Sequence, residues 1–475
     1  MRFLALFVLF LISTFHAQVN SLELMTLDNF IAKMKTENSA YQASDVNKTA
    51  SVQETSTAKL LTSPQFYATA DTSEDKSPTT APQINGTLRT TSEVQTGVQM
   101  QTDFGLNGKV FVGESDTKVS GADPNFLPPN QAELVLQNYG VELQLPILKN
   151  GFGRDVQLKK EFIQNSSDAS FAYAQFDQLQ LENKASLTYL KVAKLQEMEN
   201  LQKTSYAQGE SLVRWVKERV DTKILEPSDL SQSIASMQVR DLNLQSTLLS
   251  LSEAQKDFNT IIGLDPSHIL PKLQSLEELV PNKELISSAM YVRSDVKALS
   301  KSVAADRGNL LLKQEDFKPE LNIVGKAVGY TKQSNLNDTA RCTSFQDCSQ
   351  SYIGLTFKIP LDIAAVDNSL ASTESRIKAK ELSLEDAKKQ SAADVQKLFQ
   401  TSRLLKMQRD LSRKIIETQK LRLSQEHKRQ IYGRASAFDI IRAEQDYVDS
   451  QLNCLAIIYS QAEINTNFKL FEGQK

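Results

Sequence analysis

Side chains that could carry out chemistry are few and scattered along this chain of 475 residues. The three histidines are His16, His268 and His427, and no Ser/His/Asp, Cys/His or metal-ligand spacing surrounds them. Gly151 and Gly153 lack the third glycine of a dinucleotide-binding loop, and there is no Walker loop. We therefore expect a protein that is not an enzyme and that holds no metal or other cofactor.

The cysteines are compatible with an oxidising compartment. Cys342 and Cys348 flank a short polar loop, where a disulfide bond is permitted outside the cytoplasm, and two unpaired thiols are the alternative. Cys454 lies in a helical pattern and is expected to be a small core residue.

The N-terminus has the pattern of a secretory signal. Arg2 precedes an unbroken apolar run over 3–12, and small residues follow at Ala17 and Ser21. The run is shorter than the roughly 20 residues that cross a bilayer as a helix. We expect a signal peptide at 1–21 and export from the cytoplasm. The net charge of -3 gives no basic field, so no nucleic-acid partner is expected.

Two strands that lead into long helices organise the chain. Apolar and polar residues alternate over 139–147 and again over 353–361, and Pro146 aligns with Pro360 at an offset of 214. Such alternation is the period of a strand with unlike faces, and each proline marks a strand-to-helix junction. The residues on the polar faces include Glu142, Gln144, Thr356 and Lys358.

Further strands are expected at 65–72 and 320–330, and a hairpin over 93–114. This hairpin either extends the outer loops or adds strands to the sheet. Long stretches that are poor in proline and glycine begin near 154 and 366, and the second, of roughly 66 residues, is about 100 Å long as a helix.

The last helix of each half aligns at an offset of 210, which sets Asp229 on Asp439. Both aspartates are expected to be N-caps, and coiled-coil-like apolar seams follow them. We infer an internal duplication, with repeat one at 22–264, a connector at 265–282 and repeat two at 283–473. Each repeat is expected to contain a helix, strands, a long helix, a turn and another long helix.

The strands are long enough to cross a bilayer when tilted, which takes about 10 residues. Unpaired strand edges are not tolerated in lipid, and four strands are too few to close a barrel. Several copies must then share one barrel, with the apolar faces toward lipid and the polar-face residues toward the pore. A water-soluble β-sandwich with coiled-coil stalks is the alternative.

This organisation resembles the TolC family of outer-membrane efflux proteins. The resemblance covers essentially the whole mature chain and is carried by five segments in order: 143–147 (LQLPI), 293–296 (RSDV), 319–323 (PELNI), 357–361 (FKIPL) and 433–445 (GRASAFDIIRAEQ). It implies a mixed α and β membrane protein, a homotrimer with a twelve-stranded outer-membrane β-barrel that is continued by a long periplasmic α-helical barrel.

The resemblance also implies a function, namely the passive exit duct of a tripartite efflux pump or of a type I secretion system. The implied partners are a periplasmic adaptor (membrane fusion) protein, an inner-membrane pump of the RND, ABC or MFS type, and outer-membrane lipid. A periplasmic coiled-coil adaptor or structural protein that forms no pore is the alternative.

In the family, acidic residues just inside the tip turns line the channel constriction. By the match at Gly433, Asp439 occupies such a position and Arg442 the next one, while Asp229 and Gln232 are the equivalents in repeat one. We expect three copies of Asp439 to form an acidic ring, which Arg442 partly neutralises or ties shut. In the alternative, the two aspartates only cap their helices.

Other side chains near the tips have expected roles as well. Gly209 and Gly433 are expected to permit the tight turns, and Arg434 and Arg214 to pair with carboxylates across helices. Trp215 is expected to pack between helices, and contact with the adaptor is the alternative. The residues expected in interfacial aromatic girdles are Tyr139, Tyr330, Tyr352 and Phe357.

Overall fold

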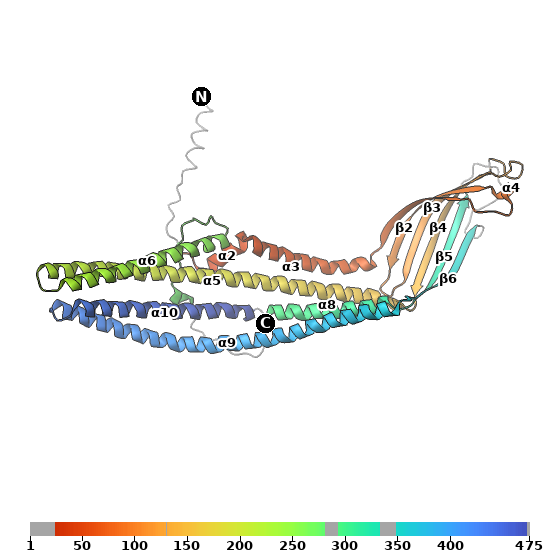
Figure 1. Cartoon of the computed structure of the whole chain (residues 1–475). Coiled ribbons are helices and arrows are strands. Elements are labelled where there is room, and N and C mark those ends of the chain that lie inside the picture. Colours follow the sequence, from red (N-terminus) through yellow and green to blue (C-terminus); the bar gives the residue numbers. More distant parts are fainter. Residues whose placement is uncertain (1–23, 130, 281–292, 333–347, 473–475) are drawn as a thin grey trace, which may run out of the picture. The chain divides into compact units, whose positions relative to one another are not determined.

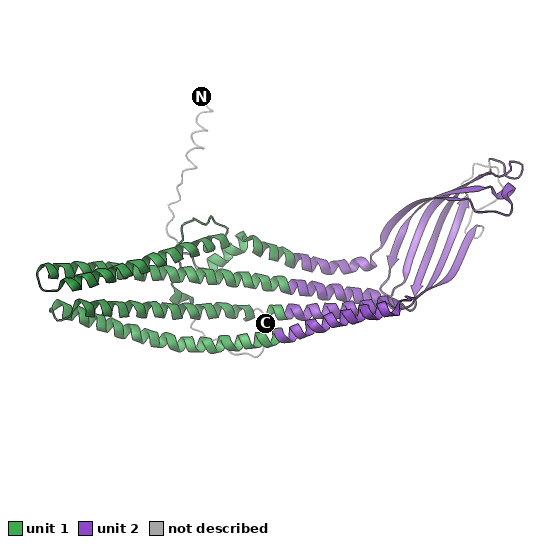
Figure 2. Cartoon of the chain, in the orientation of Figure 1, with its two compact units in different colours: residues 1–47, 173–296, 387–475 green, residues 48–172, 297–386 purple. Residues whose placement is uncertain are grey.

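The computed structural model describes residues 24–129, 131–280, 293–332 and 348–472. The chain divides into two compact units, one made of 1–47, 173–296 and 387–475 and the other of 48–172 and 297–386 (Figure 2). The expected signal peptide at 1–21 lies outside the described residues. Of the helices in the described ranges, none combines the length and the apolar character needed to cross a membrane.

Helices and strands occur in the same general order in each half of the chain (Figure 1). The main helices of the first half are α2 (Leu27–Glu37), α3 (Ser39–Thr57), α5 (Arg154–Asp221) and α6 (Pro227–Ile261). Those of the second half are α8 (Ser294–Asp316), α9 (Ile363–Ile431) and α10 (Ala437–Glu472). The short helical segments are η1 (Ala58–Thr62), α4 (Pro82–Asn85), η2 (Gly151–Gly153) and α7 (Leu276–Leu279).

Within the described ranges, the strands form one antiparallel sheet of six strands in the order β1-β2-β3-β4-β5-β6. Their bounds are β1 (Gln65–Asp75), β2 (Leu88–Gln101), β3 (Asn107–Ser120), β4 (Glu133–Pro146), β5 (Glu320–Lys332) and β6 (Ser349–Lys358). The hairpin expected over 93–114 is longer than expected, and it lies inside the sheet between β1 and β4. A twelve-stranded barrel shared by three copies takes four strands from each copy, whereas six strands are paired in this sheet.

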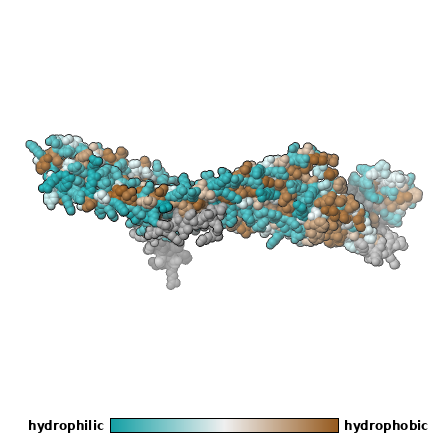
Figure 3. All heavy atoms as spheres, turned by 90° about the horizontal axis from the view of Figure 1, so that it is seen from below, coloured by the Kyte–Doolittle hydropathy of each residue, from teal (hydrophilic) through white to brown (hydrophobic). Residues whose placement is uncertain are grey.

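The strand register separates the side chains of the sheet into two unlike faces. Val98 on β2, Val110 on β3 and Val141 on β4 are paired neighbours on one face, and all three are exposed. Figure 3 shows the resulting band of hydrophobic surface over the sheet, with hydrophilic surface beyond it. Successive side chains of a strand point to opposite faces, and the residues that alternate with these valines are mostly polar or charged, so the opposite face is polar.

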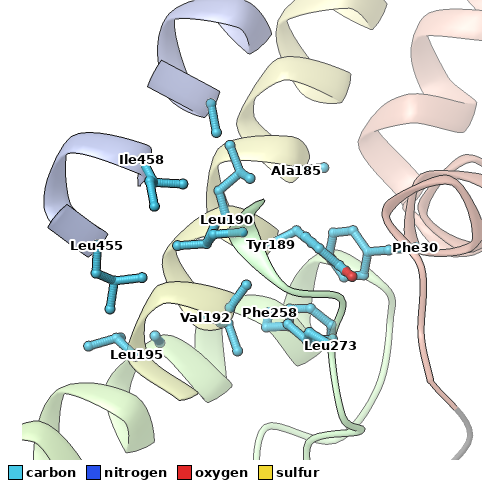
Figure 4. Packing of buried hydrophobic residues seen from close by; sticks show 14 of the residues in the cluster. Phe30, Ala185, Tyr189, Leu190, Val192, Leu195, Phe258, Leu273, Leu455 and Ile458 are labelled. Carbon is cyan, nitrogen blue, oxygen red and sulfur yellow. The ribbon is translucent and has the colours of Figure 1, made fainter. Parts of the chain in front are cut away.

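The core of the first unit is a cluster of aromatic and aliphatic side chains from α2, α5, α6 and α10 (Figure 4). Phe30 stacks on Phe258 with ring centroids 4.3 Å apart, and Tyr189 packs beside both. The Tyr189 hydroxyl donates a hydrogen bond to the carbonyl oxygen of Met25 at 2.6 Å and accepts one from the Gln274 N–H at 3.1 Å. Burial raises the pKa of Tyr189, so this hydroxyl stays protonated and can donate.

Candidate functional site

Each pair of long helices is joined by a tight turn, and the two turns are built alike. Gly433 has a φ of +67°, and Lys223, which lies 210 residues earlier, has a φ of +60°. The Lys223 N–H donates to the Val220 carbonyl at 2.9 Å, and the Gly433 N–H donates to the Gln430 carbonyl at 3.0 Å. The left-handed conformation favours glycine, which explains Gly433. In the first turn a lysine holds the same position.

Gly209 does not lie at a turn, so its expected role there is wrong. It lies within the uninterrupted helix α5. A Cβ at this position would come within 3.1 Å of the Arg240 Cδ on α6. Gly209 therefore provides space for a large side chain from the neighbouring helix, which is a use of glycine that needs no special backbone conformation.

Arg240 forms a buried ion pair that joins three helices. Its side chain is 2 % exposed, and that of its partner Glu444 on α10 is 4 % exposed. One guanidinium nitrogen of Arg240 donates to the Glu444 Oε2 at 2.9 Å, and another donates to the Ser205 carbonyl of α5 at 3.0 Å. Two unlike charges at hydrogen-bond distance stabilise each other strongly where water is excluded. The pair thus connects the helical hairpin of the first half to that of the second.

Sequence reasoning missed this pair, although a signal was present. Arg240 follows Met237 by three residues and precedes Leu244 by four, so a charge occupies a position of the apolar seam of α6. Glu444 has the same spacing to Ile441 and Val448 on α10. A charge at a seam position is buried with the seam, and a buried charge needs a partner of opposite sign.

Asp229 and Asp439 belong to capping boxes, but neither is the N-cap that the sequence predicted. Asp439 is the third residue of α10, where its Oδ2 accepts from the Ser436 hydroxyl at 2.8 Å and its N–H donates to the Ser436 Oγ at 3.1 Å. In the first half, the Asp229 Oδ2 accepts from the Glu226 N–H at 3.2 Å. The residues at the N-cap positions are therefore Ser436 and Glu226. Each aspartate lies in the first turn of its helix and accepts a hydrogen bond from its N-cap residue.

The charge of Asp439 is favoured by its surroundings. The hydrogen bonds from Ser436 hold the pKa of the Asp439 carboxyl below its ordinary value, and the positive charges of Arg429 and Arg422 act in the same direction. Arg442, which was expected to neutralise Asp439, has an exposed side chain and takes part in no ion pair among the described residues. An aspartate of this kind remains ionised at neutral pH.

The remaining tip residues are solvent-exposed. Gln232, Arg434 and Arg214 are all exposed, and the hydroxyl to which Arg214 donates within the described ranges is that of Ser211 in its own helix. The expected pairing of Arg434 and Arg214 with carboxylates across helices is therefore wrong for this conformation. Arg422 on α9 instead pairs with Asp446 on α10 at 2.6 Å, and Arg240 makes the buried pair described above.

A cavity of about 400 Å³ adjoins the buried pair, between α5, α9 and α10. Trp215, His427 and Glu444 are among the residues that line it. Trp215 also packs against Val216 and its neighbours, and the Arg219 guanidinium lies 5.4 Å from its ring centroid. Trp215 is therefore part of the helix packing. Within the described ranges, no cluster of His, Cys, Asp or Glu could hold a metal ion.

In the sheet, the four residues expected to face a pore share one face. Their register partners on β5 are Lys326 for Glu142, Val324 for Gln144, Asn322 for Thr356 and Glu320 for Lys358. Lys109 on β3 extends this face, with its Nζ 3.8 Å from the Glu142 Oε1. The face is thus polar and carries charges of both signs.

The junction prolines lie at the ends of the two expected strands. Pro146 is the last residue of β4, and Pro360 follows the end of β6. The next residue after Pro146, Ile147, still donates from its N–H to the Leu321 carbonyl at 2.8 Å. A proline removes one backbone donor and so suits the point where strand pairing stops.

The four aromatic residues expected in girdles do not share a face. Tyr139 and Phe357 lie on the apolar face, whereas the register puts Tyr330 and Tyr352 on the polar face. The girdle expectation is therefore wrong for these two tyrosines. Tyr352 instead lies across Gly354, where an added Cβ would meet its ring.

Of the three cysteines, Cys454 is a free buried thiol in the core of the first unit, as predicted. Cys348 takes part in a disulfide bond. Its predicted partner, Cys342, lies outside the described residues.

Comparison with solved structures gives matches that cover almost the whole chain. The CmeC outer membrane channel of Campylobacter jejuni has a TM-score of 0.67 and 16% sequence identity, over 94% of this chain and 85% of that chain. The open state of the Neisseria gonorrhoeae MtrE outer membrane channel has a TM-score of 0.67 and 15% identity, over 94% and 89%. The outer membrane protein VceC of Vibrio cholerae has a TM-score of 0.65 and 13% identity, over 94% and 95%.

No protein-family model matches the sequence, and no curated protein matches it. At such low identities the likeness concerns the fold. The fold predicted from the resemblance to the TolC family is confirmed: this chain has the fold of TolC-like outer-membrane channels.

Proposed function

We propose that the protein is an outer-membrane channel that serves as the passive exit duct of a tripartite efflux pump or a type I secretion system. The observation that carries this proposal is the pairing, in one chain, of a six-stranded sheet with an exposed apolar face and two hairpins of long helices. An apolar face of this kind suits lipid, and a polar face suits a water-filled passage. The shared fold with known outer membrane channels supports the same reading.

The proposed assembly is a homotrimer, with the sheet in the outer membrane and the helices in the periplasm. Exposed apolar side chains on the outer helices support association between copies. On α9 they recur at Leu404, Met407, Leu411 and Ile415, with spacings of 3, 4 and 4. On α6 they are Val239, Leu242 and Leu249. Spacings of 3 and 4 form a coiled-coil seam, which is stable only when another helix covers it. A neighbouring copy provides that helix in a closed ring.

The proposed tip constriction contains Asp439, Asp229 and the side chains that follow them one turn later, Arg442 and Gln232. Three ionised copies of Asp439 near the axis make a ring that favours cations. The proposed partners are a periplasmic adaptor, which contacts the helical part, and an inner-membrane pump. The polar face with Glu142, Gln144, Thr356 and Lys358 lines the barrel in this proposal.

Cell fractionation and reconstitution test the proposal directly. The protein is expected in the outer-membrane fraction, as trimers that dissociate only on heating in detergent, and it is expected to conduct ions in planar bilayers. A chain that stays soluble without detergent, with no conductance, contradicts the channel and favours a periplasmic adaptor or structural protein. Deleting the protein and assaying both drug tolerance and the secreted proteome then assigns the cargo.

A further inference from the structure

The hairpin formed by β2 and β3 sits inside the sheet, although it is an insertion relative to the two-stranded plan of the second half. Every residue of β1 pairs with β2, and β3 pairs with β4 along most of its length. Because β1 and β4 flank the hairpin, the chain enters and leaves it within the same sheet. An extracellular loop has no need of such continuous backbone pairing.

The apolar band crosses the hairpin without interruption. Phe66 pairs with Val98, Val98 with Val110, and Val110 with Val141, so one row of neighbours runs from β1 to β4. All four side chains are exposed, at 74, 46, 59 and 42 %. Exposed apolar side chains at one level on four successive strands are expected of a wall in contact with lipid. The apolar face of the hairpin is therefore expected to contact the same environment as the apolar face of β4.

On the polar face, side chains fasten the hairpin to β4 and β5. Phe111 of β3 is buried between Gly97 and Gly140, where a Cβ at either glycine would meet it within 3.0 Å. The Lys326 Nζ on β5 lies 5.3 Å from the centre of the Phe111 ring. These contacts join four strands. A Cβ at Gly140 would overlap the ring itself, and one at Gly97 would crowd the Cα and Cβ of Phe111.

A second contact crosses β3 completely. The Asn138 side chain on β4 donates from its Nδ2 to the Glu93 Oε1 on β2 at 3.1 Å. Between them lies Gly113, whose missing side chain leaves room for Asn138. The hairpin is thus held by backbone pairing, by an aromatic ring in a glycine slot and by this hydrogen bond.

We propose that β2 and β3 are part of the membrane-spanning wall, so that three copies close a barrel of eighteen strands through pairing of β1 with β6 of the next copy. This rests on the proposed trimeric channel. Among the described strands, β1 and β6 at the two edges each have one neighbour, and lipid does not tolerate an unpaired edge. Six strands are too few to close alone, since transmembrane barrels have about eight or more.

The added strands widen the passage. With strands about 4.8 Å apart and tilted by about 40°, a ring of eighteen strands is about 36 Å across at the backbone, against about 24 Å for twelve. Barrels of 16–18 strands leave an aqueous channel. Selection of cargo by size then falls on the helical tip rather than on the barrel.

Spin labels on single cysteines, in a cysteine-free background of the full-length chain in lipid nanodiscs, test the inference. The label at Val98→Cys on β2 tests whether the hairpin contacts lipid. Gln99→Cys places a label on the opposite face of the same strand as a control, and Val141→Cys on β4 is the reference for a lipid-facing position. Collision rates with oxygen and with a water-soluble nickel complex report the surroundings of each label. The label at Val98 is expected to match that at Val141, with access to oxygen and not to nickel, whereas the label at Gln99 is reached by nickel.

The possible outcomes separate the two proposals. If the label at Val98 is reached by nickel while that at Val141 is not, the hairpin lies outside the bilayer and the inference is overturned, although the channel survives. If nickel reaches both, the membrane assignment fails and the inference fails with it. Electron cryomicroscopy of the same particles supplies a direct strand count, in which eighteen is expected and twelve overturns the inference.

Discussion

The guanidinium of Arg240 on α6 and the carboxylate of Glu444 on α10 are 2.9 Å apart, and both are almost fully buried. Their helices belong to different halves of the chain. The Arg240 Nε has no hydrogen-bond partner within the described residues, so the attraction of Glu444 must outweigh the loss of water at this charge. A conformational change that separates the two hairpins has to break this pair.

Replacing Arg240 by alanine is expected to destabilise the helical part by about 3–5 kcal/mol, because the buried Glu444 carboxylate loses the guanidinium at 2.9 Å and, among the described residues, keeps only the more distant His427 Nε2 at 3.9 Å. Thermal unfolding followed by circular dichroism measures the loss. The double variant Arg240→Met/Glu444→Leu is expected to recover most of it, since it removes both charges and keeps apolar volume. A double variant that is as unstable as the single one contradicts this account.

Arg422→Ala is the matched control, because it also removes an arginine that pairs across helices. The side chains of Arg422 and Asp446 are 41 % and 37 % exposed, so water screens them. The expected cost is only about 0–1 kcal/mol. In planar bilayers, Arg240→Ala is expected to increase the fraction of time spent open more than Arg422→Ala does.

The effect of Gly209→Ala on stability is expected to have opposite signs in the native chain and in the Arg240→Ala variant. In the native chain the new methyl group approaches the Arg240 Cδ to 3.1 Å and pushes it from Glu444. In the Arg240→Ala background this conflict is gone, and the substitution is expected to stabilise α5 by about 0.5–1 kcal/mol, because alanine favours helix over glycine. Unfolding of the four proteins of this cycle measures the coupling. Equal changes in stability with and without Arg240 contradict the claim that glycine at position 209 provides space for the Arg240 side chain.

The general plan of this fold was predictable from the sequence because it depends on periodicity. Alternation located the strands that contain Pro146 and precede Pro360, and the offset of 210 aligned the last helices. Glycine does not mark the turn of the first hairpin, since Gly209 lies within α5. The same offset, applied to Gly433, leads to Lys223, which adopts the left-handed conformation without being glycine.

Tertiary placement accounts for the other differences. Nothing in the sequence of 88–120 distinguishes a hairpin in a barrel wall from one in an outer loop, since both alternate. The place of β2 and β3 is determined by pairing with β1 and β4. The pairing of Arg240 with Glu444 likewise joins residues 204 positions apart, which only the packing of the two hairpins brings together.

Two substitutions at the second tip turn separate capping from charge. Asp439→Ala removes both the capping box and the carboxylate, whereas Ser436→Ala removes the hydroxyl of the cap and keeps the charge. Each is expected to cost about 1 kcal/mol of stability. Only Asp439→Ala is expected to reduce cation selectivity in planar bilayers. If Ser436→Ala lowers selectivity equally, or neither variant does, the acidic ring is contradicted.

The pH dependence of this turn follows from the lowered pKa of Asp439, whose main cause is hydrogen bonding from Ser436. The folded chain favours the carboxylate. Its stabilising contribution is therefore complete above the ordinary aspartate pKa of about 3.9, and it is lost as the pH falls through the lower pKa of the folded chain. The difference in melting temperature between the native protein and Asp439→Asn is expected to be largest at neutral pH and to shrink at acid pH. A difference that is constant with pH contradicts the assignment.

Gly140 and Gly325 form a matched pair for testing how the sheet is packed. A Cβ on Gly140 would meet the Phe111 ring at 2.6 Å, whereas one on Gly325 would meet nothing within 4 Å. Gly140→Val is expected to push the ring from its slot at a cost of about 1–3 kcal/mol and to lower the yield of heat-modifiable trimers in the outer membrane. Gly325→Val is expected to leave the yield unchanged or to raise it, since valine favours strands. Equal losses in both variants mean that the sheet excludes side chains generally and that the slot for Phe111 has no special part in holding the inserted hairpin.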